Sequence, residues 1–286
     1  MKIAISTEST SDLSKTLLEE NNIFVIRYPV LLGENVYSDG DNITPEQIFE
    51  FVDETGKLPK TSAINEFTFV DYFKNILDQG YDGIIHISLS SKISSTYKNA
   101  TNAATKFDGK VKVIDSLSLS TGSGLLVLYA SELAKQGLDL DTIYNKVSNR
   151  VKYVQTSFVV NTVEYLHKGG RCSGLAKFAA NILRLKPQII MENGEMHPGK
   201  KYRGRNSQIV ENYCKDILEE YNNPDLSIAF VTHTVASDEM IEAAKKALID
   251  RGFKKIIETT AGCTITSHCG PKTLGILFIN DGGESK

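Results

Sequence analysis

The sequence predicts an α/β fold of two domains, with a doubly wound, mostly parallel sheet in the N-terminal domain and a mixed sheet in the C-terminal domain. In the first half of the chain, short apolar segments alternate with polar loops and amphipathic segments, a pattern typical of parallel strands connected by helices. The second half alternates similarly but places Asn193-Gly194 between two apolar segments. Asn-Gly favours the tight turn of a β-hairpin and therefore antiparallel strands.

In the N-terminal half, strands are expected where apolar residues run together, at residues 2–6, 23–32, 83–88 and 111–115. Helices are expected at residues 13–21, from residue 45, and at 67–79, 96–106, 124–135 and 141–152. Asp12 is the expected cap of the first helix. The second begins at Thr44-Pro45-Glu46-Gln47, where Thr44 and Gln47 suit a capping box and Pro45 suits the first helical position.

A new strand-like segment begins near residue 157, so we predict domains of residues 1–156 and 157–286. A chain of 286 residues is long for one domain of ~100–200 residues. In the second domain we expect helices at 175–185, 207–221 and 237–251, and strands at 187–191, 195–197, 227–232, 255–259 and 274–279. The last strand region is a candidate for packing back on the first domain.

Composition excludes several classes of protein. Lysine and arginine number 32 and aspartate and glutamate 35, a net charge of −3, without the basic surplus that nucleic-acid binding usually needs. No apolar stretch approaches the ~20 residues that span a bilayer, and no secretory signal is visible, so we expect a cytoplasmic protein. Cys263, His268 and Cys269 fit no usual zinc spacing, so we expect reduced thiols and no metal.

The segments that follow the predicted parallel strands are rich in hydroxyl groups. They cover residues 6–12, 88–97 and 115–124, and Thr61-Ser62 adds two further hydroxyls. Ligands of α/β sheets bind beyond the carboxyl ends of the strands, and hydroxyls with backbone N–H groups suit one small anionic group. One such loop alone is better explained by helix capping. Several such loops at one sheet edge suit an anion site and helix capping about equally.

Two further residues suit an anion site. His268 lies in a hydroxyl-rich segment that we expect to be a loop, and histidine titrates nearest neutrality, which makes it the best candidate for handling a proton. Arg171 follows Gly169-Gly170 and can hold a carboxylate or phosphate with two hydrogen bonds. The segment His167-Lys168-Gly169-Gly170-Arg171 equally suits the basic end of a helix that stops at glycine, and a lone histidine such as His268 is more often structural.

An apolar stripe marks the predicted helix at 175–185 and the strand that follows it. Phe178 and Ile182 recur in this stripe at helical spacing, and Ile190 lies in the next apolar segment. The stripe is either domain core or the wall of an apolar tunnel between the domains. Arg203 and Arg205 belong to a local basic cluster, which is either a solvated face or a contact for an acidic partner.

Several of these segments resemble the DegV family of bacterial fatty-acid-binding proteins, which includes subunits of bacterial fatty acid kinase. The resemblance covers essentially the whole chain, and the order and spacing of its motifs make it specific. Those motifs are Ser6-Thr7-Glu8-Ser9-Thr10-Ser11-Asp12-Leu13, Lys60-Thr61-Ser62, Ser90-Ser91-x-x-Ser94-x-Thr96-Tyr97, Val113-Ile114-Asp115-Ser116, Glu164-Tyr165-Leu166-His167-Lys168-Gly169-Gly170-Arg171 and His268-x-Gly270-Pro271. Lys92 and Ser95 stand where the family usually has glycine.

The resemblance implies that a long-chain fatty acid is buried between the two domains. Thr61 and Ser94 would bind its carboxyl group with His268 close by. The carboxylate-binding set that we predict from these motifs is Thr61, Ser62, Ser94, Ser95, Thr96 and His268. The predicted acyl-tunnel residues are Phe178, Ile182 and Ile190.

The resemblance also implies a partner. A fatty acid kinase would reach the carboxylate at the edge formed by Arg171 and His268, and Arg203 and Arg205 match a region that meets this partner. The kinase would form the acyl phosphate for phospholipid metabolism and supply nucleotide and metal. The chain itself would be a lipid carrier without cofactor or enzymatic activity. We further expect a monomer that touches membrane surfaces transiently and binds no nucleic acid.

Two other functions remain open from the residues alone. Ser94, His268 and Asp115 allow a Ser/His hydrolase of acyl esters, although the chain contains no G-x-S-x-G motif. A small-anion regulatory module would use the hydroxyl loops without an apolar tunnel. Esterase activity would identify the first function, and the identity of a bound ligand would separate the second from a fatty-acid carrier.

Overall fold

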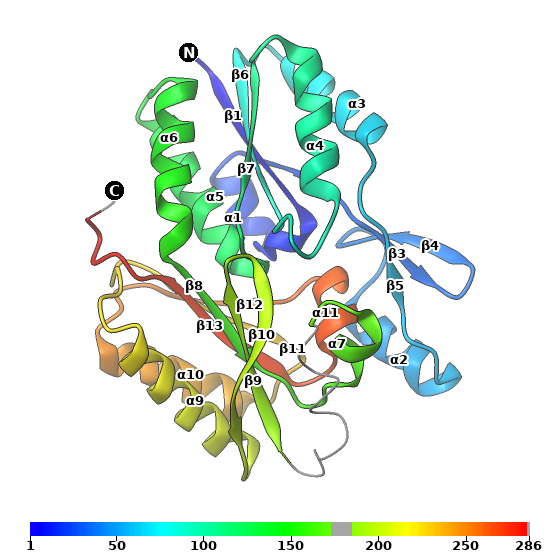
Figure 1. Ribbon diagram of the computed structural model, residues 1–286, viewed down its shortest axis with the longest axis vertical. Coiled ribbons are helices and arrows are strands. Elements are labelled where there is room, and N and C mark those ends of the chain that lie inside the picture. The colour runs from blue at the N-terminus through cyan, green and yellow to red at the C-terminus, as the bar shows by residue number, and fades with distance from the viewer. Residues whose placement is uncertain (173–184, 285–286) are drawn as a thin grey trace.

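The computed structural model describes residues 1–172 and 185–284, which form three sheets with helices around them (Figure 1). The first sheet is entirely parallel and has the strand order β2-β1-β6-β7. Its strands are β1 (Ile3–Glu8), β2 (Ile23–Ile26), β6 (Gly83–Ser88) and β7 (Val111–Asp115).

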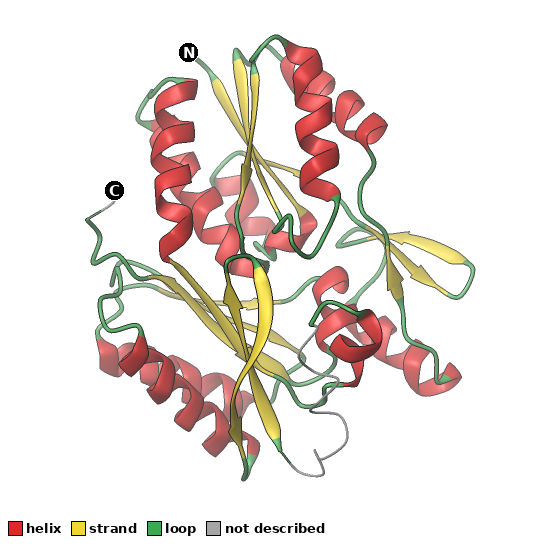
Figure 2. Cartoon of the chain, viewed as in Figure 1, coloured by secondary structure: helices red, strands yellow, loops and turns green. Residues whose placement is uncertain are grey.

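Helices cover both faces of the first sheet (Figure 2). They are α3 (Glu66–Leu77) and α4 (Thr96–Ala104) on one face and α5 (Ser120–Lys135) and α6 (Leu140–Arg150) on the other. Alternate residues of β6 serve the two faces, because side chains alternate along a strand. Ile84 packs with Phe69 of α3, whereas Ile85 packs with Leu126 of α5. This arrangement confirms the doubly wound parallel sheet.

A small third sheet extends from the side of the first domain, with strand order β4-β3-β5. Its strands are β3 (Pro29–Leu32), β4 (Asn35–Ser38) and β5 (Lys60–Thr61), so the expected strand at 23–32 is in fact two strands, β2 and β3. Between β4 and β5 lies α2 (Pro45–Thr55), and its predicted capping box between Thr44 and Gln47 is confirmed.

The predicted N-cap of the first helix, Asp12, was wrong. Helix α1 (Lys15–Glu20) is capped by the Ser14 hydroxyl, which accepts a hydrogen bond from Leu17 N. Asp12 instead adopts a left-handed conformation that ends the short 3₁₀ helix η1 (Ser9–Ser11). Its carboxyl group instead accepts hydrogen bonds from Ser120 Oγ and from Gly262 N in the C-terminal half of the chain.

The second sheet is mixed, as predicted, with strand order β10-β9-β8-β13-β11-β12. Only β11 and β12 pair in parallel. Its strands are β8 (Val154–Val159), β9 (Lys186–Glu192), β10 (Glu195–Tyr202), β11 (Ala229–Thr234), β12 (Ile256–Thr260) and β13 (Thr273–Ile279). Asn193 and Gly194 have φ values of 50° and 85° at the turn between β9 and β10, which confirms the predicted hairpin.

The two faces of the second sheet pack against helices from different halves of the chain. Helices α9 (Asn206–Glu220) and α10 (Asp238–Arg251) cover one face, and α5 of the first domain lies against the other (Figure 1). Leu277 and Ile279 of β13 belong to the same apolar cluster as Leu126 of α5. The remaining elements are 3₁₀ helices η2 (Thr105–Phe107) and η3 (Val151–Tyr153) and helices α7 (Glu164–Gly169) and α11 (Cys263–Cys269).

Two expected loops are helical. Helix α5 begins at Ser120 rather than at residue 124, and His268 lies in α11 rather than in a loop. The predicted helix at 175–185, with Phe178 and Ile182, lies outside the described residues apart from its last residue. No helix in the described part of the chain is long and apolar enough to cross a bilayer.

A buried arginine ties the two domains together. Arg150, the last residue of α6, is 3% exposed and donates Nε to Asp281 Oδ2 over 2.8 Å and Nη2 to Asp225 Oδ2 over 2.6 Å. Its guanidinium also lies 4.6 Å from the ring centre of Tyr129. Asp225 precedes β11 and Asp281 follows β13, so this cluster fixes the first domain against one end of the second sheet.

Candidate functional site

A cavity of about 280 Å³ lies where the three sheets and α11 meet. This volume is just below the ~300–1,000 Å³ of typical small-molecule sites. The cavity combines hydroxyls and one histidine with apolar walls. Its described lining residues are Tyr28, Thr61, Ala63, Leu89, Ile93, Ser94, Ser95, Leu119, Leu166, Arg171, Met196, Thr264, Ile265, His268 and Cys269.

Thr61 and His268 form the first polar pair of the cavity. Thr61 lies in β5 beside β3, and its Oγ1 is 2.8 Å from His268 Nε2 of α11. Burial and the nearby positive charge of Arg171 lower the pKa of His268 to about 4, so the imidazole is neutral at pH 7. Its Nδ1 has no hydrogen-bond partner among the described residues. The pair therefore presents a neutral hydrogen-bonding surface to the cavity.

Gly169 at the end of α7 makes room for this histidine. A Cβ atom at position 169 would lie 2.7 Å from His268 Nδ1, closer than real Cβ contacts. Gly169 therefore allows α7 to approach α11 closely. Gly170, with φ of 69°, is the C-cap that ends α7. The interpretation of this segment as a helix end is confirmed, and Arg171 also lines the cavity.

Carboxylates from the first domain hold the N-terminus of α11. Asp39 accepts hydrogen bonds from Cys263 N over 2.7 Å and Thr264 N over 3.2 Å. Asp12 accepts a third from Gly262 N over 2.8 Å. Carboxyl oxygens at a helix N-terminus accept hydrogen bonds from N–H groups that have no partner within the helix. These contacts fix α11, and with it His268, to the first domain.

Asp12 gives the stability of this junction a pH dependence. Burial raises the pKa of Asp12 to about 8 from an ordinary value of 3.8, against the opposing hydrogen bonds from Ser120 and Gly262. The folded state therefore holds a proton that the unfolded state releases between about pH 4 and 8, so this group lowers stability as pH rises through that window.

Asp12→Asn should gain stability relative to wild type over the same window. Urea unfolding at pH 5 and 8.5 measures it; an identical difference at both values would contradict the prediction.

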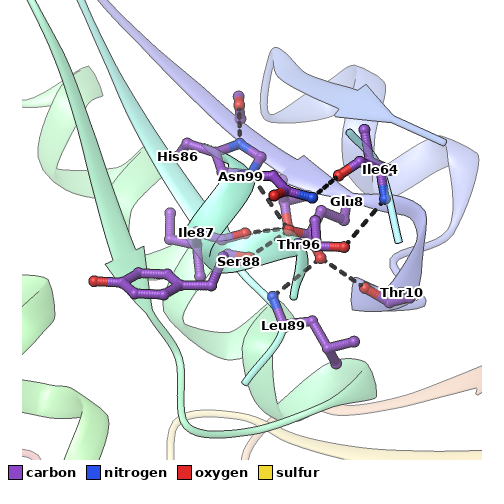
Figure 3. A network of polar contacts seen from close by, with 12 residues as sticks. Glu8, Thr10, Ile64, His86, Ile87, Ser88, Leu89, Thr96 and Asn99 are labelled. Carbon is purple, nitrogen blue, oxygen red and sulfur yellow. Dashed lines mark hydrogen bonds and ion pairs between the residues drawn. The ribbon is translucent and has the colours of Figure 1, made fainter. Parts of the chain in front are cut away.

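Ser94, between β6 and α4, and Thr96, the first residue of α4, form a second polar group. Ser94 Oγ donates to Thr96 Oγ1 over 3.0 Å and lies 3.1 Å from the hydroxyl of Tyr28. Thr96 Oγ1 also accepts from Ile64 N over 3.2 Å, which ties α4 to the segment after β5 (Figure 3). Thr96 is fully buried behind Ser94 and does not line the cavity.

The cavity has an outer mouth. A surface depression of about 380 Å³ shares Thr61, Arg171 and His268 with it. Lys60 and Lys168 also line this depression. The three shared residues therefore stand between the interior cavity and a basic patch of the surface.

A second small space continues the cavity inward, toward the second sheet. It measures about 20 Å³ and shares Leu119, Ile265 and Cys269 with the main cavity. Its other walls include Phe158 of β8 and Leu277 of β13. These three shared side chains form an apolar partition between a polar end at Thr61 and the space beneath the second sheet.

The predicted site residues fall into three groups. Thr61, Ser94, Ser95, Arg171 and His268 lie together on one cavity. Ser62 is exposed beside it, Ile190 lies in β9, and Arg203 and Arg205 are exposed between β10 and α9; none of these lines the cavity or its mouth. Thr96 belongs with this second group, since it is buried and lines neither the cavity nor its mouth. Phe178 and Ile182 lie outside the described residues.

Several cavity residues were not predicted from the sequence. Tyr28 lies in the short link between β2 and β3 and lines the cavity. Its polar hydroxyl within an apolar, β-rich run was the only signal in the sequence that it could belong to a site. Leu119, Met196 and Ile265 are single apolar residues from three separate elements or loops. Nothing in their local pattern distinguishes them from ordinary core residues.

The residues suggested for a hydrolytic triad do not form one. Asp115 Oδ1 accepts hydrogen bonds from Ser91 N and Leu117 N, not from His268. The hydrogen bonds of Ser94 run to Tyr28 and Thr96. Within residues 1–172 and 185–284, no group of three or more His, Cys, Asp or Glu side chains is placed to hold a metal ion.

Comparison with known proteins identifies close relatives. Residues 2–281 match the family model described as "Uncharacterised protein, DegV family". A DegV domain-containing protein of Caldanaerobacter subterraneus is 31% identical over 280 residues, covering 97% of this chain and 98% of the relative.

Solved structures share the fold. The fatty-acid-binding DegV family protein of Thermus thermophilus superposes with a TM-score of 0.91 at 28% identity, over 98% of this chain and 100% of that chain. A stearic acid-binding protein of Eubacterium ventriosum superposes with a TM-score of 0.85 at 26% identity, over 98% and 99% of the two chains.

Proposed function

The chain belongs to the DegV family, and we propose that it binds a long-chain fatty acid in the cavity at Thr61, Ser94 and His268. The observation that carries this proposal is a single cavity with hydroxyl groups near its mouth and apolar side chains, Leu119, Ile265 and Cys269, at its inner end. A fatty acid has the same division into one small anionic group and a long apolar tail. The fatty-acid-binding relatives with the same fold support the assignment.

Neutral donors would hold the carboxylate. Thr61 donates its hydroxyl proton to the carboxylate, so its oxygen must accept from His268 Nε2–H at 2.8 Å. Because the pKa of His268 is about 4, this arrangement persists at neutral pH. Ser94 donates to the other carboxylate oxygen. Ser62, Ser95 and Thr96 would complete the surroundings of the head group.

The acyl chain would run inward past Leu119, Ile265 and Cys269 toward the second sheet. Each buried CH₂ group contributes roughly 0.8 kcal/mol, so a long tail gives tight binding with few polar contacts. Ile190, together with Phe178 and Ile182 outside the described residues, would add to the wall of the tunnel.

The passage past Ile265 should set chain-length preference. Ile265→Ala widens the apolar partition, so the affinity for stearic acid relative to myristic acid should rise by about 3- to 10-fold, in line with the free energy of burying further CH₂ groups. Ile249→Ala, at a 63% exposed residue of α10, is the matched control and should leave the ratio unchanged. An unchanged ratio in Ile265→Ala would place the tail elsewhere.

The mouth suits delivery of the head group to a partner. We propose that a fatty acid kinase subunit reaches the carboxylate through the depression lined by Lys60, Lys168 and Arg171, with Arg203 and Arg205 as further contacts. The chain would act as a monomeric carrier in the cytoplasm. It would have no cofactor of its own and would touch membranes only transiently.

Acyl phosphate formation by such a kinase should require this protein and fall in Arg171→Ala.

The proposal is tested by titrating delipidated protein with stearic acid and following displacement of a fluorescent fatty acid. Saturable binding of one stearic acid per chain is expected, with no hydrolysis of acyl esters by the protein alone. Binding of acetate or phosphate but not stearic acid would favour a small-anion module. Ester hydrolysis abolished in Ser94→Ala would favour the hydrolase.

A further inference from the structure

We propose that Leu119 is the gate through which the acyl tail passes, and that the tip of the β9–β10 hairpin holds this gate shut. This inference rests on the proposed function, because it concerns the tail of the ligand in the same cavity. It assigns a role to the β7–α5 link (residues 116–119), which the head-group contacts do not use.

The cavity is too small for the whole of a long-chain fatty acid. A cavity of about 150 Å³ holds one benzene molecule, so the cavity of about 280 Å³ holds roughly ten non-hydrogen atoms, about half of stearic acid. The inner space beyond the partition measures about 20 Å³, room for little more than one water-sized group. A long tail therefore needs Leu119, Ile265 or Cys269 to move aside.

Two of these three partition residues are fixed in place. Ile265 and Cys269 belong to α11, whose N-terminus is hydrogen-bonded to Asp12 and Asp39 of the first domain. Leu119 is the N-cap of α5, has an extended backbone and makes no side-chain capping bond. Leu119 is therefore the partition residue that can move without unseating a helix.

The backbone on both sides of Leu119 is strained. Leu117 and Ser120 have φ values of 47° and 53°, in the left-handed region that residues other than glycine rarely adopt. Such conformations persist where surrounding contacts impose them, and they recur at ligand clamps and switches. The β7–α5 link is thus held by its contacts rather than by its own conformational preference.

The hairpin tip supplies one of these contacts (Figure 1). Ser90 Oγ, in the segment after β6, donates to Gly194 O of the hairpin turn over 2.7 Å, while Ser90 N donates to Ser118 O of the link over 3.0 Å. A Cβ atom at Gly194 would lie 2.9 Å from Leu117 Cδ2, so the turn is seated directly against the link. Ser90 thereby joins the hairpin tip to the link that carries Leu119.

The hairpin tip therefore controls the passage. While Ser90 holds Gly194, the tip rests on Leu117 and Leu119 stays in the partition. When that hydrogen bond breaks, the tip withdraws, the strained link relaxes, and Leu119 leaves room for the tail. The tip seats again once the tail has passed, with Leu119 beside the tail, so the gate changes the rates of entry and exit and not the affinity.

The test measures how fast trans-parinaric acid, a fluorescent polyene fatty acid, enters and leaves delipidated protein. Stopped-flow mixing gives the association rate constant, and displacement by excess stearic acid gives the dissociation rate constant. Ser90→Ala removes the bond to Gly194 O and keeps the backbone N–H that bonds to Ser118 O. Both rate constants should rise by about 3- to 10-fold, the effect of losing one hydrogen bond, with the affinity within about twofold of wild type.

Matched variants separate the gate from a general loosening of the fold. Ser91→Ala is the control and should keep the wild-type rates, because Ser91 is exposed and its backbone N–H still donates to Asp115 Oδ1. Leu119→Ala removes the gate itself, so adding Ser90→Ala should change neither rate further, since changes that act through one device are not additive. Ser90→Cys, a weaker donor of similar size, and Leu119→Val replace the alanine variants where those do not fold.

Three outcomes overturn the inference and leave the proposed function standing. They are unchanged rates in the Ser90 variant, a rise of the dissociation rate alone, and an acceleration that persists in the Leu119→Ala background. Failure of the wild type to bind trans-parinaric acid and stearic acid contradicts the proposed function itself.

Discussion

Arg150→Met is expected to lower the free energy of unfolding by about 3–5 kcal/mol, the cost typical of removing one partner from a buried ion pair. The variant removes the guanidinium but keeps an apolar side chain of similar length. It leaves Asp281 without its hydrogen bonds at 2.8 Å and 3.2 Å and deprives Asp225 of its 2.6 Å contact. Asp281 is also 5% exposed, so its charge would stay largely out of water. Urea unfolding followed by circular dichroism measures the loss.

The control for this prediction removes the charges together. A variant with Arg150→Met, Asp225→Asn and Asp281→Asn has no uncompensated buried charge and should recover a large part of the lost stability, because the penalty comes from unpaired charges. Lys246→Met, which breaks the exposed pair with Asp250, should change stability by less than ~1 kcal/mol. Equal stabilities of Arg150→Met and wild type would contradict the role of Arg150 as the tie between the domains.

Thr61→Val is expected to weaken stearic acid binding by about 10- to 100-fold, the effect of losing a hydrogen bond to a charged group. Valine has nearly the same shape as threonine but cannot donate to a carboxylate. It also leaves His268 Nε2 without the partner that lies 2.8 Å away in the wild type. Fluorescence displacement by stearic acid measures the affinity, and circular dichroism shows whether the fold is kept.

Two matched variants accompany Thr61→Val. Thr61→Ser keeps the hydroxyl and should bind stearic acid within about threefold of wild type. Thr101→Val removes an exposed hydroxyl that bonds only within α4, to Tyr97 O, and should not change binding. Wild-type affinity in Thr61→Val would show that the carboxylate lies elsewhere in the protein.

The regular elements of this fold were largely predictable because their signals are local. The strands at 83–88 and 111–115 coincide with β6 and β7, since each is a short apolar run between polar turns. The hairpin followed from Asn193-Gly194, whose positive φ values the tight turn requires. The strands of the first sheet could therefore be assigned from sequence, except that the run at 23–32 is divided between β2 of the first sheet and β3 of the small sheet.

The elements that failed depend on distant contacts. Helix α11 consists of Cys, Thr, Ile, Ser and His, which are weak helix formers, and its N-terminus is held by Asp39, 224 residues away. The start of α5 contains Gly122, where a Cβ would lie 2.1 Å from Thr156 Oγ1. Close packing against β8 thus requires a glycine that by itself argues against a helix.

The candidate site was partly predictable for the same reason. Thr61, Ser94, Arg171 and His268 belong to recognisable motifs, and the fold brings them to one cavity. Tyr28 has no such motif, and its contact with Ser94 joins residues 66 positions apart. Its place on the cavity therefore depends on the folded chain.

Native mass spectrometry of the protein purified without delipidation, followed by denaturation and identification of the released molecule, tests the central claim most directly. The account predicts one long-chain fatty acid per chain, depleted in Thr61→Val. A protein that carries no lipid and whose mass does not shift when stearic acid is added would contradict it.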